Sequence, residues 1–166
     1  MTTRPIPPDP ADPAGPRQTI RAAATGLLAR RDHAAGELAR KLQTKGYPSG
    51  DVATVVQELI DSRTLDDARY AHNYVAYHAG RGQGPVRIGA DLKALGVPPE
   101  LIEAALGGGP DWQGLAREQR RRRFGPQPPA SWPEKARQAR FLQYRGFSSD
   151  HIRSALGADF DPDSPS

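Results

Sequence analysis

The amino-acid sequence predicts an all-α protein built from three similar helical units in tandem. A glycine followed by an apolar or aromatic residue recurs every fifty residues, at Gly46, Gly96 and Gly146. Apolar residues on both sides of each glycine are three and four residues apart, which places them on one face of a helix but on both faces of a strand. With 37% apolar residues, the chain suits an elongated row of small units better than one compact globule.

Each recurring glycine is expected to end one helix shortly before the next begins, as in a helix-turn-helix corner. Leu42 precedes the first glycine and Val52 follows it, and apolar residues recur at the same offsets in the other two units. Glycine adopts the left-handed backbone of such a helix end without a steric clash. We therefore expect positive φ angles at all three glycines, and a loss of about 1 to 2 kcal/mol when valine replaces any one of them.

The first unit is predicted over residues 17–62 and contains three helices. The third helix has the clearest apolar spacing. The apolar positions of the unit are Ile20, Ala24, Leu27, Leu28, Leu38, Leu42, Val52, Val55, Val56, Leu59 and Ile60.

The second unit is predicted over residues 63–109. Asp66 and Asp67 suit the N-terminus of its first helix, because carboxylates cap free N–H groups and oppose the helix dipole. Residues 82–85 should separate its first two helices, and Pro99 should open the third. Its apolar helix positions are Ala68, Ala71, Tyr74, Val75, Ile88, Leu92, Leu95, Leu101, Ile102, Ala105 and Leu106.

The third unit is predicted over residues 110–157, after a glycine-rich joint. A first helix leads into four consecutive arginines, which cannot all be buried because they span more than one helical turn. A proline-rich loop over 125–133 should then precede helices over 134–145 and 149–156, the last of them capped by Ser148.

Composition predicts how much the two ends of the chain contribute to folding and in which compartment the protein lies. Residues 1–16 are rich in proline and residues 158–166 are acidic, so neither segment is expected to add much to folding. The chain has no cysteine, no apolar run near the roughly 18 residues of a membrane span, and no signal-peptide pattern. We expect a cytoplasmic protein without membrane contact.

Positive charge is concentrated in the third unit, which has 10 basic and 4 acidic side chains, whereas the net charge of the whole chain is +4. Arginine pairs in a bidentate manner with phosphates and carboxylates, so this surface is a candidate contact for nucleic acid or acidic protein; the alternative is solvated surface. The candidate residues in this unit are Arg117, Arg120, Arg121, Arg122, Arg123, Arg137, Arg140, Arg145 and Arg153. Weaker candidates in the first two units are Arg40, Lys41, Lys45 and Arg87.

No pattern in the sequence supports catalysis, a cofactor or a metal. The segment 82–85 lacks the preceding strand and the Lys-Ser/Thr ending of a phosphate-binding loop. The four histidines show no ligand spacing, and adjacent helical residues such as Asp66 and Asp67 point about 100° apart.

Five stretches, in the same order over most of the chain, resemble the signature stretches of the RecX family. They are 28–33 (LARRDH), the pairs 37–38 (EL), 41–42 (KL) and 45–46 (KG), 65–71 (LDDARYA), 82–88 (GQGPVRI) and 141–148 (FLQYRGFS). The chain departs from the family at Ala34, where a serine often caps the second helix, and at Gln83, where an apolar or aromatic residue is common.

The resemblance implies a function as well as a fold. It implies three tandem three-helix repeats in an elongated, curved array that lies as a monomer in the helical groove of the RecA–DNA filament. There the protein would modulate RecA ATPase activity, strand exchange and the SOS response, and inhibition is the expected direction. Two alternatives stay open, namely a module that binds single- or double-stranded DNA directly through its basic third repeat, and an enzyme.

Overall fold

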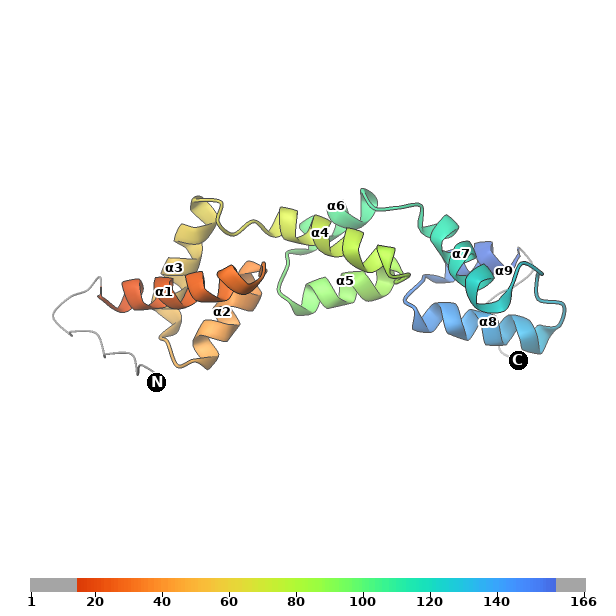
Figure 1. Ribbon diagram of the computed structural model, residues 1–166, viewed down its shortest axis with the longest axis horizontal. Coiled ribbons are helices and arrows are strands. Elements are labelled where there is room, and N and C mark those ends of the chain that lie inside the picture. Colours follow the sequence, from red (N-terminus) through yellow and green to blue (C-terminus); the bar gives the residue numbers. More distant parts are fainter. Residues whose placement is uncertain (1–14, 158–166) are drawn as a thin grey trace. The chain divides into compact units, whose positions relative to one another are not determined.

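The computed structural model describes residues 15–157, and within them the chain forms nine helices and no strand (Figure 1). The all-α prediction and the three three-helix repeats are confirmed. The first repeat contains α1 (Gly15–Arg30), α2 (Ala35–Thr44) and α3 (Ser49–Asp61). The second contains α4 (Asp67–Gly80), α5 (Pro85–Ala94) and α6 (Pro99–Gly107). The third contains α7 (Trp112–Phe124), α8 (Trp132–Tyr144) and α9 (Ser149–Leu156).

Two helices begin earlier than the sequence predicts. α1 begins at Gly15 rather than near residue 17, and α8 begins at Trp132 rather than at residue 134. The Ser131 hydroxyl caps α8 by accepting from the Glu134 N–H at 3.3 Å, and Pro133 is tolerated in the first turn of a helix. The predictions for the terminal segments fall on residues 1–14 and 158–166, which lie outside the described residues.

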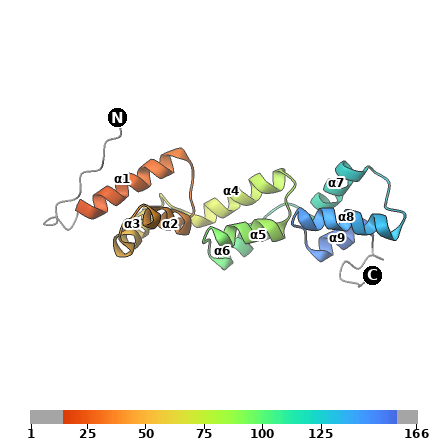
Figure 2. The same cartoon turned by 90° about the horizontal axis from the view of Figure 1, so that it is seen from below.

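The described residues divide into two compact units, one of residues 15–70 with 95–97 and the other of 71–94 with 98–157. The core of the first unit is built on the apolar stripes of α1, α2 and α3, and Ile20, Leu38, Leu42, Val52 and Val55 are fully buried there. In the second unit α7, α8 and α9 pack as one bundle around Leu142 (Figure 2). Each bundle therefore buries most of the side chains that the helical spacing selects; Ile60, predicted on the apolar face of the third helix, is instead 39% exposed near the end of α3.

The recurring glycines have the predicted left-handed backbone, with φ of 97° at Gly46, 82° at Gly96 and 93° at Gly146. At the first corner the Tyr47 N–H donates to Leu42 O, and at the third the Phe147 N–H donates to Leu142 O. Both corners thus satisfy the last carbonyls of the preceding helix.

The surroundings of these corners differ. A side chain on Gly46 would meet nothing within 4 Å, whereas one on Gly146 would overlap Arg87 Cβ. The turn before α5 covers the third corner, because Gly84 N–H donates to Arg145 O at 2.8 Å and Val86 N–H to Gly146 O at 2.9 Å. The same glycine at equivalent positions is therefore exposed in one repeat and enclosed in another.

The missing cap of α2 is supplied from a distant part of the chain. Ala34 has no side chain that can cap the helix, but Asp67 Oδ1 accepts from Ala35 N–H at 2.8 Å. The neighbouring Asp66 caps α4 itself, accepting from Arg69 N–H at 3.0 Å. Of the two acids predicted to cap one helix, each therefore caps a different one.

We expect Asp67→Ala to lower the free energy of unfolding by about 1 to 2 kcal/mol, because it removes the cap of α2. Asp67→Asn should recover most of this loss, since its amide oxygen can accept from the same N–H. Urea denaturation of both variants checks the prediction. An alanine variant as stable as the native chain would show that the contact does not stabilise α2.

Within the described part of the chain, no helix is both long and apolar enough to cross a membrane.

Candidate binding surface of the third repeat

The arginine run lies in the C-terminal half of α7, a helix whose N-terminus is fixed by Asp111, which accepts from Gly114 N–H at 3.1 Å. Arg121, Arg122 and Arg123 occupy the last turn, where positive charge is favoured by the helix dipole. All three are exposed. The local fold therefore tolerates a dense positive charge at this helix end.

Arg120 differs from its neighbours because it is buried, with 8% of its surface exposed. Its guanidinium donates to Gln138 Oε1 at 3.2 Å, to Gln127 O at 3.1 Å and to Gly125 O at 3.4 Å. These bonds fix the loop between α7 and α8. Although Arg120 belongs to the contact set predicted from the sequence, these hydrogen bonds assign it to the structure of the repeat and not to the binding surface.

Three of the other arginines lie over the rings of two phenylalanines. The guanidinium carbons of Arg123 and Arg137 lie 5.5 and 5.2 Å from the centre of the Phe124 ring, and that of Arg145 lies 5.4 Å from the centre of the Phe141 ring. The two rings meet edge to face at 5.3 Å. We call these five residues the arginine–aromatic ladder. A guanidinium held over a ring loses less freedom on binding and keeps N–H groups for a second partner.

The surface also contains arginines that are not neutralised locally. Arg121, Arg123, Arg140 and Arg145 have no carboxylate partner among the described residues. By contrast, Arg122 pairs with Glu118 at 2.8 Å, Arg137 with Glu134 at 2.9 Å and Arg153 with Asp150 at 3.0 Å. Arg117 donates to the Ser154 hydroxyl at 3.0 Å. The first four form the unpaired set.

Arg87 belongs with this surface, although it comes from the second repeat. Its Cβ packs against Gly146, the residue after Arg145, and its side chain is exposed. The covered third corner therefore brings an α5 arginine beside the end of α8. Arg40 and Lys45 are exposed on the first repeat.

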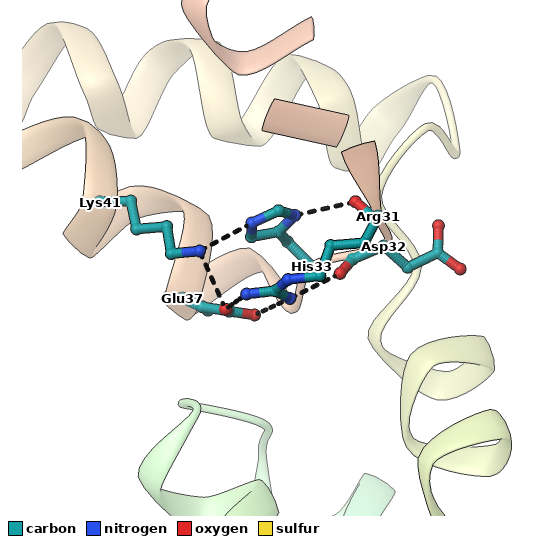
Figure 3. A network of polar contacts seen from close by, with 5 residues as sticks. All are labelled: Arg31, Asp32, His33, Glu37 and Lys41. Carbon is teal, nitrogen blue, oxygen red and sulfur yellow. Dashed lines mark hydrogen bonds and ion pairs between the residues drawn. The ribbon is translucent and has the colours of Figure 1, made fainter. Parts of the chain in front are cut away.

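Lys41, the remaining candidate, takes part in a polar network of the first repeat (Figure 3). Its ammonium lies 3.5 Å from Glu37 Oε1 and 3.1 Å from His33 Nε2, and Arg31 pairs with the same carboxylate. Burial raises the pKa of Glu37, but the hydrogen bond and charge of Arg31 outweigh it and lower that pKa overall. Burial also lowers the pKa of His33, so its neutral ring can accept from Lys41. These contacts assign Lys41 to the fold of the first repeat.

The segment 82–85, rejected as a phosphate loop, serves as the turn that covers the third corner. The Gly84 N–H is already bonded to Arg145 O and Gly84 is buried, so this amide is not available to an anion. Among residues 15–157 no group of three His, Cys, Asp or Glu side chains could bind a metal ion.

Sequence reasoning did not find the ladder. A signal for it was present, since Phe124 directly follows the arginine run, and Arg137, Phe141 and Arg145 are spaced four residues apart on one helical face.

Comparison with known proteins identifies all three repeats. Residues 21–59, 66–106 and 111–156 match the models of the first, second and third three-helix domains of RecX. The "Regulatory protein RecX" of Halorhodospira halophila is 44% identical over 142 residues, which are 85% of this chain and 88% of that protein. That of Xanthomonas axonopodis pv. citri is 40% identical over 157 residues, covering 92% and 97%. The crystal structure of RecX from Lactobacillus salivarius aligns with a TM-score of 0.74 at 22% identity, over 86% of this chain and 96% of that one.

Proposed function

Because this chain belongs to the RecX family of regulatory proteins, which act on the recombinase RecA and are not enzymes, we propose that it binds in the helical groove of the RecA–DNA filament and inhibits RecA there. The inhibited activities would be ATP hydrolysis, strand exchange and the SOS response. The protein would act in the cytoplasm, as a monomer.

The observation that supports a filament contact is the unpaired set, Arg121, Arg123, Arg140 and Arg145, together with Arg87. A protein in the groove meets DNA phosphates, acidic side chains of the recombinase, or both. Guanidinium groups without local carboxylate partners can pair with either in a bidentate manner, and their concentrated charge also accelerates encounter with a polyanion.

A second candidate function, direct binding of DNA without the recombinase, is favoured by the arginine–aromatic ladder. Positive charge interleaved with aromatic rings is typical of proteins that bind nucleic acid, because phosphates pair with the charges. Under this alternative, inhibition of RecA would follow from occupation of the DNA.

The amount of protein needed for inhibition distinguishes the two functions. A RecA ATPase assay on single-stranded DNA should show inhibition at amounts too small to cover the DNA, since one groove-bound molecule affects neighbouring subunits. Inhibition that begins only when the strand is nearly covered would contradict groove binding and favour direct competition for DNA. An unrelated ATPase that depends on single-stranded DNA provides the control, and its activity should be unchanged at the lower amounts.

A further inference from the structure

The outward face of α8 carries an aromatic side chain that the fold does not use. Tyr144 is 80% exposed, more than the other exposed large hydrophobic side chains of the described residues, such as Tyr77 at 59% and Trp132 at 44%. Within residues 15–157 the Tyr144 side chain makes no hydrogen bond, aromatic contact or cation–π contact. The side chain therefore adds nothing to the core of the repeat.

Tyr144 is surrounded along the helix by arginines. Arg140 lies one turn before it, and residues at this spacing share one side of a helix. Arg145 follows directly, and its guanidinium is held over Phe141, one turn back along α8. From Arg140 to Arg145 the backbone advances by about 7.5 Å along the helix axis, and Tyr144 lies between these two arginines in the chain.

This arrangement has the two components that recognise an unpaired nucleotide. An exposed ring can stack on the face of any base, and flanking cations can pair with the phosphates on either side. In a duplex the base faces are covered by their neighbours, so the ring would gain nothing there. An acidic protein surface would pair with the arginines, but its carboxylates would gain no favourable contact with the face of the ring.

We propose that the outward face at the end of α8, formed by Arg140, Tyr144 and Arg145, binds single-stranded nucleic acid, with Tyr144 stacked on an unpaired base. Arg137 is not part of this face, because it pairs with Glu134. The inference deepens the second candidate function by naming the substrate class and the stacking residue. Its test needs no recombinase, so its failure and the failure of groove binding are separate results.

The test measures the affinity of the full chain for three fluorescent probes by anisotropy: an oligothymidylate, an abasic strand of the same length, and a duplex. Tyr144→Ala should weaken binding of the oligothymidylate about tenfold, the loss expected for one stacked base, and should leave binding of the abasic strand unchanged. Tyr144→Phe should bind like the native chain, because it keeps the ring.

Two further variants separate stacking from charge. Tyr77→Ala removes an exposed tyrosine of the second repeat and should change no affinity. Arg140→Ala should weaken binding of both the oligothymidylate and the abasic strand, and should make the slope of log affinity against log salt less negative by about 0.7. Melting temperatures near that of the native chain would establish that each variant is folded.

Three results would overturn the proposal. The first is native affinity of Tyr144→Ala for the oligothymidylate. The second is an equal loss on the abasic strand, which would assign Tyr144 a role in placing the charges. The third is a native chain that binds neither single strand without RecA, which would make this face a protein contact.

Discussion

Reversing the charge of the unpaired set, with glutamate in place of Arg121, Arg123, Arg140 and Arg145, is expected to abolish inhibition of RecA ATPase activity. Each replacement turns an attraction for phosphate or carboxylate into a repulsion, and the four act on the same surface. The variant should stay folded. None of the four has a carboxylate partner among the described residues, and the contacts of Arg123 and Arg145 with the phenylalanine rings contribute only about 0.5 to 1 kcal/mol each. Arg120 is left unchanged, since a buried glutamate there would face carbonyl oxygens.

A control for this variant reverses four exposed charges outside the third repeat, at Arg30, Arg63, Arg69 and Lys93. It has the same net charge as the test variant and should still inhibit RecA. Inhibition by the test variant at the native concentration would contradict the assignment. The contacts would then have to lie on the first two repeats, where the exposed Arg40 and Lys45 would be replaced next.

Gly146→Ala is expected to lower the free energy of unfolding by about 3 kcal/mol or more, which is a larger loss than we expect at the equivalent glycine of the first repeat. The added Cβ would overlap Arg87 Cβ and lie 2.9 Å from Arg87 N, and the residue would also keep a φ of 93°. The left-handed backbone alone costs about 1 to 2 kcal/mol for a residue with a side chain, and overpacking adds about 1 to 3 kcal/mol.

Gly46→Ala is the matched variant, because it has nearly the same φ and open space around the added methyl group. Its loss should be only the backbone part, about 1 to 2 kcal/mol. Urea denaturation of both variants measures the difference. Equal losses would show that the turn before α5 does not enclose the third corner in solution.

This contrast marks the limit of prediction from the sequence. Local rules were sufficient for the positive φ angles, because a helix that stops at a glycine and turns into another needs the same backbone each time. The same rules predicted an equal loss of stability on substitution at all three corners. They do not include contacts between residues far apart in the chain, such as that between Arg87 and Gly146. The cap of α2 was missed for the same reason, since Asp67 reaches Ala35 from another repeat.

The sequence predicted the location of the positive surface better than the roles of its individual arginines. The arginine excess of the third repeat follows from composition, and the exposed positions on α8 follow from helical spacing. Burial of Arg120 does not, because two of its acceptors are carbonyls of an irregular loop, whose path the sequence does not specify. The ladder depends on Phe124 and Phe141, which meet only after that loop has brought α7 and α8 together.

The central claim is that the third repeat contacts the filament through its unpaired arginines and the outward face of α8. The most direct test is a structure of this chain bound to a RecA filament on single-stranded DNA. We predict that Arg121, Arg123, Arg140 and Arg145 lie within hydrogen-bonding distance of DNA phosphates or acidic RecA side chains in the groove. A bound chain whose third repeat faces solvent, with contacts made only by the first two repeats, would contradict the claim.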